Sequence, residues 1–252
     1  MKSWSVKRKM ADEIINCSNI EKNISTILAK IREFEKKCGR SEGSVRLVAV
    51  SKFHPEESVV AAIKAGLCLF GENRVQEASA KFESLREKGF SPELHIIGSL
   101  QRNKAKEAVR IAECIESVDR IELADEIEKQ CAKLGKKIDV LFEIHTGEES
   151  KAGFTSEEEL VKVLSSCQDG LYPHIVPRGF MTMAPNTSDE NAVRNSFRTV
   201  RLLKEKMQEQ FKSLDLAELS MGMSGDFPIA IEEGSTMVRV GTAIFGERDY
   251  SK

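Results

Sequence analysis

Short apolar segments rich in β-branched residues alternate with segments of helical periodicity along most of this 252-residue chain. Buried parallel strands have this composition, and a strand followed by a helix returns to the same sheet in the parallel direction. Eight such units predict closure into one α/β domain, a (β/α)8 TIM-type barrel. The expected strands are 47–50, 67–70, 94–97, 114–118, 138–144, 179–183, 217–221 and 237–240.

Helices are expected at 55–65, 75–87, 103–112, 119–134, 157–165, 189–211, 227–233 and 244–248. A further amphipathic helix precedes the first strand, because apolar residues recur at helical spacing from Ile20 to Phe34. Ser18 or Asn19 is its expected N-cap, and Gly39 its expected C′ residue. This helix is expected to cover the outside of the barrel.

An open doubly wound sheet would also alternate strands and helices. Such a sheet usually has a topological switch point and often a glycine-rich nucleotide loop, and the sequence contains neither G-x-G-x-x-G nor a P-loop. No linker rich in Pro, Gly or Ser interrupts the chain. We therefore expect a single domain over residues 1–252, with residues 1–15 as a flexible N-terminal extension.

Composition excludes several classes of function. The 38 basic and 40 acidic residues give a net charge of -2, which offers no electrostatic footprint for nucleic acid. The six cysteines form no C-x-x-C pair, so reduced thiols are expected rather than a zinc ribbon or disulfides, and the four histidines show no metal-binding spacing. The sequence shows no secretory signal and no apolar run long enough to span a bilayer. These features predict a cytoplasmic protein without a metal or membrane partner.

Polar residues follow several of the expected strands, at the end where a barrel carries its active site. Lys52 stands directly after the first strand, in the loop before a helix that begins near Pro55. A desolvated lysine amine can form a Schiff base with a carbonyl compound. From this stretch alone, a lysine that solvates a surface loop is the simpler interpretation.

The loops after the seventh and eighth strands resemble a phosphate site, which barrels often place there. Ser224 and Thr242 carry hydroxyl donors, Gly241 allows close backbone approach, and Arg239 supplies a fixed positive charge. Alternatively, Gly241 and Thr242 turn the chain and cap a helix, and Arg239 pairs with Glu232 or Glu233.

Three further strand-end residues have simpler interpretations of their own. Asn73 follows the second strand, His95 lies among apolar residues as core histidines often do, and Met183 fills the core by default. A lysine at one strand end and a phosphate site at two others predict a phosphorylated carbonyl ligand. Pyridoxal 5′-phosphate (PLP) fits this description, as does the sugar phosphate of a Schiff-base aldolase.

Seven further segments occur in a characteristic order. They are VAVSK (48–52), FGEN (70–73), IGSLQRNK (97–104), GEESKAGF (147–154), RGFMTM (178–183), LSMGMS (219–224) and GSTMVRVGTAIFG (234–246). Together they resemble the pyridoxal phosphate homeostasis proteins, a family of PLP-binding proteins related to the N-terminal domain of alanine racemase. The similarity extends from Val45 to Gly246 and argues against the aldolase.

The resemblance implies a fold type III PLP barrel without the C-terminal β-domain of alanine racemase. It implies that Lys52 carries PLP as an internal aldimine. It also implies that Ser224, Arg239, Gly241 and Thr242 hold the phosphate, and that Asn73, His95 and Met183 lie near the ring. The sequence departs from the family pattern at Arg74, Ser99 and Gly225, which concerns the outer wall of the pocket.

A racemase of this class needs a second base on the opposite face of the ring, which in alanine racemase is a tyrosine from the following β-domain. The two tyrosines here, Tyr172 and Tyr250, lie in a proline-flanked stretch and at the tail. We therefore expect a monomeric carrier, not an enzyme, that maintains PLP (vitamin B6) homeostasis and can deliver PLP to apo-enzymes. The alternative is a PLP-dependent amino-acid racemase or a related fold type III enzyme.

Overall fold

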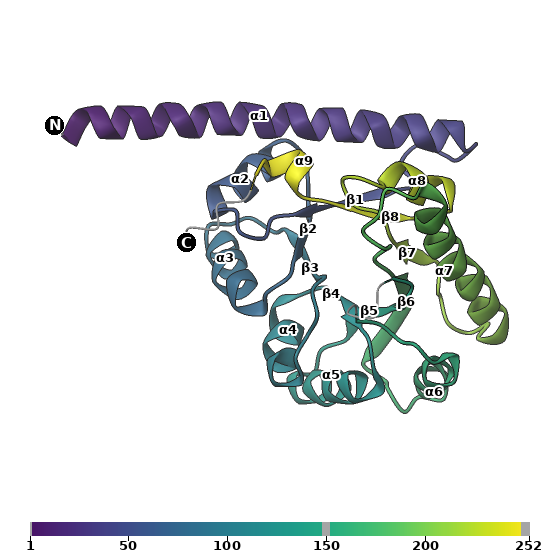
Figure 1. Ribbon diagram of the computed structural model, residues 1–252. Coiled ribbons are helices and arrows are strands. Elements are labelled where there is room, and N and C mark those ends of the chain that lie inside the picture. Colours follow the sequence, from purple (N-terminus) through teal and green to yellow (C-terminus); the bar gives the residue numbers. More distant parts are fainter. Residues whose placement is uncertain (1, 148–151, 248–252) are drawn as a thin grey trace.

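The computed structural model describes residues 2–147 and 152–247. Its eight parallel strands follow one another in chain order, and β8 pairs with β1 to close a barrel that helices surround (Figure 1). The predicted (β/α)8 barrel is therefore confirmed. The strands are β1 (Arg46–Val50), β2 (Leu69–Glu72), β3 (Glu93–Ile96), β4 (Cys114–Val118), β5 (Ile138–Glu143), β6 (Ile175–Met181), β7 (Glu218–Ser220) and β8 (Met237–Val240).

The helices of the described residues follow the predicted order, with differences at their ends. The predicted start of the helix at residue 119 is two residues early, because α5 begins at Ile121 after Arg120. The helices are α1 (Lys2–Lys37), α2 (Glu56–Lys64), α3 (Val75–Glu87), the 3₁₀ turn η1 (Arg102–Lys104), α4 (Ala105–Ile111), α5 (Ile121–Leu134), α6 (Glu157–Gln168), α7 (Glu190–Gln210), α8 (Phe227–Glu232) and α9 (Thr242–Phe245).

The α1 helix packs across α2, α8 and α9 on one side of the barrel (Figure 1). Its buried stripe contains four isoleucines, Ile20, Ile24, Ile27 and Ile31, at the spacing of an amphipathic helix. Gly39 has φ 67°, as predicted for a residue just past the helix end. The predicted N-cap at residues 18–19 is wrong, because helical backbone begins at Lys2 and includes residues 2–15.

Alternate residues of each strand face opposite sides of the barrel wall. In β1, Leu47 and Ala49 belong to the large apolar core between the sheet and the helices. Val48 belongs to a small apolar cluster inside the barrel, together with residues such as Leu141 and Met181. Val50, the last residue of β1, continues the inward-facing series of Val48, and Lys52 follows two residues later in the turn after the strand.

Strand β6 begins at Ile175, four residues before the predicted start at 179. The prolines at 173 and 177 concealed this start, since proline is rare inside strands. The register between β5 and β6 shifts where Pro177 and Gly179 face Val140 and Leu141, and this irregularity accommodates the proline.

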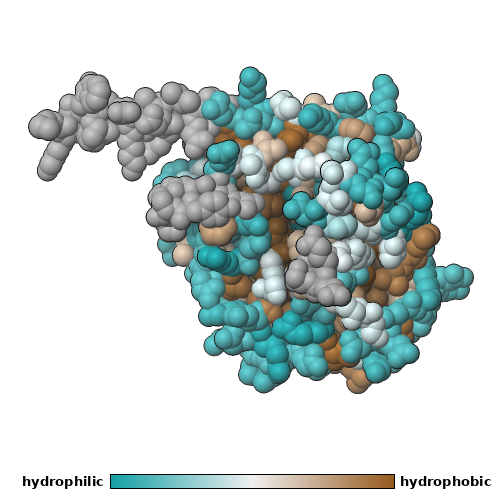
Figure 2. Space-filling model, in the orientation of Figure 1, coloured by the Kyte–Doolittle hydropathy of each residue, from teal (hydrophilic) through white to brown (hydrophobic). Residues whose placement is uncertain are grey.

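Hydrophilic residues cover most of the molecular face in Figure 2. None of the helices in the described part of the chain has the length and apolar character needed to cross a bilayer. The five cysteines whose side chains are described, Cys38, Cys68, Cys114, Cys131 and Cys167, are free thiols.

Candidate cofactor site

The closed parallel barrel brings the carboxyl ends of its strands together at one mouth. Residues predicted from five strands lie there: Lys52 after β1, Asn73 after β2, Met183 after β6, Ser224 after β7, and Gly241 with Thr242 after β8. Lys52, Asn73 and Met183 are half-buried, whereas Ser224 and Thr242 are exposed. The structure therefore assembles these six predicted residues on the same side of the barrel.

The backbone after Lys52 adopts an unusual conformation. Phe53 has φ 64°, a left-handed value that is rare for a bulky residue and unfavourable. The Phe53 N–H donates to Oε1 of Glu77 at 2.7 Å, and the guanidinium of Arg74 lies 5.1 Å from the Phe53 ring centre. Arg74, one of the departures from the family pattern, thus packs on the residue next to Lys52.

A buried ionic cluster lies behind the same loop, between the barrel wall and α3. Lys81 Nζ donates to the carbonyl oxygen of Ser51 at 2.9 Å, to Oε1 of Glu72 at 2.8 Å and to Oε1 of Glu77 at 3.1 Å. The Ser51 hydroxyl also donates to Glu72, at 2.7 Å. The cluster therefore fixes the residues on both sides of Lys52. Lys81 was not predicted as part of the site, because its spacing of four residues from Glu77 is its only local signal.

The loops after β7 and β8 lie side by side, because Arg239 N–H donates to the carbonyl oxygen of Gly222 at 2.9 Å. A Cβ atom on Gly241 would lie 3.0 Å from the carbonyl oxygen of Val50, so glycine lets this loop approach β1 and hence Lys52. Within the described residues, four backbone N–H groups of these loops donate no hydrogen bond, those of Ser224, Gly225, Thr242 and Ala243.

The loop after β3 supports Asn73 from the neighbouring side. A Cβ atom on Gly98 would lie 2.6 Å from the carbonyl oxygen of Asn73 and 2.8 Å from its Cα. Only glycine permits this close contact, so the position of Asn73 at the mouth depends on Gly98.

Arg239 lies inside the barrel, one inward-facing position below Gly241, and is 4 % exposed. Its Nη1 donates to the carbonyl and hydroxyl oxygens of Ser220 at 2.6 and 2.8 Å, and its Nη2 donates to the carbonyl oxygen of Thr182 at 2.8 Å. The contact of Arg239 with a phosphate stays a prediction. Both ends of the guanidinium fork bind protein acceptors, and the charge lies at the floor of the mouth.

His95, which was predicted to lie near the ring, is buried inside the barrel and not at its mouth. Its Nδ1 lies 2.6 Å from Oε1 of Glu116, and its Nε2 lies 2.9 Å from Oε1 of Glu93. Burial lowers the pKa of His95, but the hydrogen bonds to these two carboxylates outweigh burial and raise the pKa to about 9. The hydrogen bond to Glu116 holds the ring inside the barrel, and no local sequence pattern indicates this partner.

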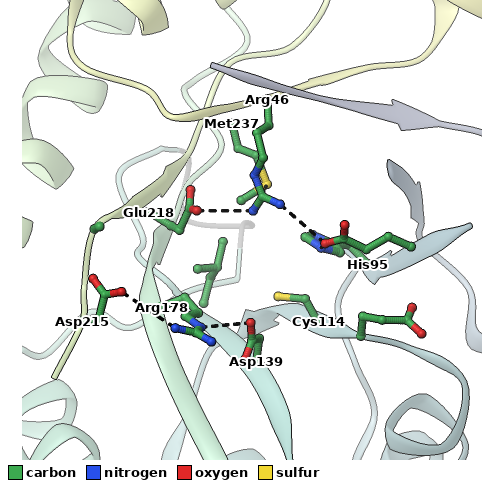
Figure 3. Close-up of a pocket in the computed structure, with 12 residues that line it drawn as sticks. Arg46, His95, Cys114, Asp139, Arg178, Asp215, Glu218 and Met237 are labelled. Carbon is green, nitrogen blue, oxygen red and sulfur yellow. Dashed lines mark hydrogen bonds and ion pairs between the residues drawn. The ribbon is translucent and has the colours of Figure 1, made fainter. Parts of the chain in front are cut away.

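His95 also lines a cavity of about 250 Å³ at the amino ends of the strands, opposite the mouth. Figure 3 shows Arg46 in an ion pair with Glu218 and pointing toward His95. Arg178 forms ion pairs with Asp215 and Asp139. Arg46, Arg178, Asp139, Asp215 and Glu218 of this cavity are thus paired with one another, and Glu113 pairs with Arg86 outside the cavity. Across the described residues, no group of three His, Cys, Asp or Glu side chains could hold a metal ion.

Two segments bearing earlier predictions lie outside the described residues. They are residues 148–151 of the GEESKAGF segment and residues 248–252, which include Tyr250 and the predicted end of the last helix.

Comparisons with known proteins agree with the fold and the motifs. The model of the family "Alanine racemase, N-terminal domain" matches residues 15–249. The pyridoxal phosphate homeostasis protein of Vibrio alginolyticus is 41 % identical over 239 residues, which cover 93 % of this chain and 100 % of that protein. The corresponding protein of Aquifex aeolicus is 38 % identical over 232 residues, covering 92 % and 100 %.

Solved structures give the same result. The structure of PipY from Synechococcus elongatus with PLP bound is 33 % identical, has a TM-score of 0.79, and matches over 90 % of this chain and all of that one. An alanine racemase of Clostridium difficile shares the fold at 18 % identity, with a TM-score of 0.69 over 91 % of this chain and 56 % of that one. The chain therefore belongs to the alanine racemase N-terminal domain family and, within it, to the pyridoxal phosphate homeostasis proteins.

Proposed function

We propose that this chain is a cytoplasmic, monomeric carrier that binds PLP covalently at Lys52 and maintains PLP homeostasis. One observation supports this most. Lys52 lies at the same barrel mouth as four backbone N–H groups that donate no hydrogen bond to any described residue, where the Gly241 loop contacts β1. The names of the relatives and the solved structure of PipY with PLP bound support the identity of the ligand.

The residues at the mouth fit this cofactor. The Lys52 amine would bind the aldehyde, and the N–H groups and hydroxyls around Ser224, Gly241 and Thr242 would bind the phosphate, which only accepts hydrogen bonds there. Asn73 and Met183 would border the ring, and Arg239 would supply a fixed positive charge beneath it, a role that arginine has in PLP sites. When bound, the cofactor supplies an electrophilic aldehyde on an electron-withdrawing ring.

The position of Tyr172 favours a carrier over a racemase. Tyr172 precedes β6, at the amino end of the barrel, and its hydroxyl donates to Asp125 at 2.5 Å. It therefore cannot act as a second base at the mouth. We propose that the bound PLP is delivered to apo-enzymes and that the single barrel domain has no nucleic-acid or membrane partner.

Covalent binding is tested by loading the purified protein with PLP, reducing it with borohydride and locating the adduct by mass spectrometry. The expected adduct is on Lys52 and is lost in Lys52→Ala together with the visible absorption band. Lys104→Ala is the control, because Lys104 also follows a strand of the barrel, and it should retain both. An adduct of undiminished yield in Lys52→Ala would refute the assignment.

The carrier role is tested by mixing loaded protein with an apo-enzyme that requires PLP and following recovery of its activity. Recovery faster than the spontaneous release of PLP from the protein supports direct delivery. In parallel, single enantiomers of several amino acids are incubated with loaded protein. Sustained racemisation, absent in Lys52→Ala, would favour an enzyme.

A further inference from the structure

A continuous polar chain crosses the interior of the barrel, where barrels usually pack branched apolar side chains. It runs from Arg239 on β8 through Ser220 on β7 and Glu116 on β4 to His95 and Glu93 on β3. The Ser220 Oγ to Glu116 Oε2 distance is 2.5 Å. Ser220, Glu116, His95 and Arg239 are each less than 6 % exposed, so water contributes little to this chain.

The direction of each hydrogen bond in the chain follows from simple donor counting. Arg239 can only donate, so Ser220 Oγ accepts from Arg239 and uses its one proton to donate to Glu116. Both ring nitrogens of His95 face carboxylates, which requires an imidazolium with two N–H donors. Burial raises the pKa of Glu116, but the hydrogen bond and charge of His95, the charge of Arg239 and the hydrogen bond from Ser220 together outweigh burial and lower the pKa. Glu116 is therefore an ionised acceptor at both oxygens.

Charges alternate along this chain. Arg239 and His95 are positive, Glu116 between them is negative, and Glu93 at the far end is negative. Without the carboxylate of Glu116, two buried cations would remain in the same barrel interior, which is unfavourable at low dielectric. Glu143 and Asp226 also act electrostatically on Arg239 and favour its charged form, but no hydrogen bond joins them to its guanidinium.

We propose that Ser220, Glu116 and His95 are positioning residues, which hold the Arg239 guanidinium in one orientation and balance its charge at the floor of the cofactor site. The inference rests on the proposed function, since the floor matters only if PLP binds above it. The chain links the cavity at the amino ends of the strands, through His95, to the cofactor mouth.

The first test uses protein without cofactor. Slow rotation of the Arg239 guanidinium should give separate NMR signals for its two Nη groups. Ser220→Ala should speed the exchange between these signals, because only the bonds to the carbonyl oxygens of Ser220 and Thr182 would remain. Ser220→Thr, which keeps the hydroxyl, should restore the slow exchange. Ser235→Ala is the matched control, because Ser235 is equally buried and the acceptors of its hydroxyl are backbone carbonyl oxygens, those of Leu219, Met221 and Met237. Unchanged Arg239 signals in Ser220→Ala would overturn the proposal.

The second test uses loaded protein. Titration with PLP should show an affinity about tenfold lower in Ser220→Ala and in Glu116→Gln than in the parent or in Ser235→Ala, the size expected for one hydrogen bond to a charged group. In histidine-labelled protein, PLP loading should shift the His95 ring-nitrogen signals, and Ser220→Ala should abolish this shift.

Equal affinity and an equal His95 shift in Ser220→Ala and the parent would overturn the positioning role. If the parent itself binds no PLP, the proposed function fails. The guanidinium rotation still tests the chain in that case, so the two failures are distinguishable.

Discussion

Replacing Lys81 with methionine should destabilise the protein strongly, because it removes the only cation that hydrogen-bonds to Glu72 in the described structure. Glu72 is fully buried, and its Oε2 has no hydrogen-bond partner within the described residues. Its Oε1 accepts from Lys81 and from Ser51. Methionine keeps most of the packing volume of the lysine stem, so the change acts mainly on charge.

Breaking one partner of a buried ion pair costs about 3–5 kcal/mol, and we expect a loss of this size at pH 8. Burial raises the pKa of Glu72, and Lys81 is the largest opposing influence, so the substitution should raise that pKa further. A carboxyl group with a raised pKa in the folded state binds its proton preferentially there. Stability in the variant should therefore fall as the pH rises above the ordinary carboxyl range. At pH 5, Glu72 can be neutral, and the loss should shrink to about 1–3 kcal/mol, the cost of lost hydrogen bonds.

Urea denaturation at pH 5 and pH 8 measures this difference. The double variant Lys81→Met with Glu72→Gln should lose the pH dependence, since no uncompensated charge remains. Lys37→Met is the control, because Lys37 forms an exposed ion pair with Glu232, and it should change stability little. A loss below about 1 kcal/mol at both pH values would refute the argument that Glu72 needs Lys81.

Three further changes test other parts of the structure. His95→Gln should reduce stability by about 3 kcal/mol below pH 6.5, since the folded protein raises the pKa of His95 from 6.5 to about 9; the difference from the parent should vanish as the pH rises through 9. Gly98→Ala should weaken PLP binding at least about tenfold, because its Cβ atom would displace Asn73, and PLP titration checks this. Asp189→Ala should cost about 1 kcal/mol in urea denaturation, since Asp189 caps α7 by accepting from the N–H of Asn191 at 2.9 Å.

Much of the fold could be predicted from the sequence because each strand and helix carries its own local pattern. The α3 helix and strands β4 and β8 have the bounds that the pattern predicted. The start of β6 could not be predicted, because a register shift in the neighbouring pair is what tolerates Pro177. The start of α1 was predicted too far along the chain, because helical backbone continues upstream of Ser18 and Asn19, although both residue types often cap helices.

The mouth residues were predictable because the fold alone places all strand ends together. Lys52, Ser224 and Gly241 needed only the strand assignment and the chemistry of their side chains or backbone. The positions of His95 and Arg239 required knowledge of their partners, Glu116 and Ser220, which come from other strands. Local sequence patterns do not specify such pairs, so the interior chain became visible only in the structure.

The least favourable local features of the barrel gather around Lys52. Phe53 adopts a left-handed backbone conformation, which costs about 1–3 kcal/mol, and the Glu72 carboxylate is buried behind the same loop. Inside the barrel, the guanidinium of Arg239 occupies space that apolar side chains would fill more favourably. Natural sequences tend to depart from local optima at functional sites. The concentration of these costs on both sides of one lysine therefore supports Lys52 as the residue that the surrounding barrel is built to position.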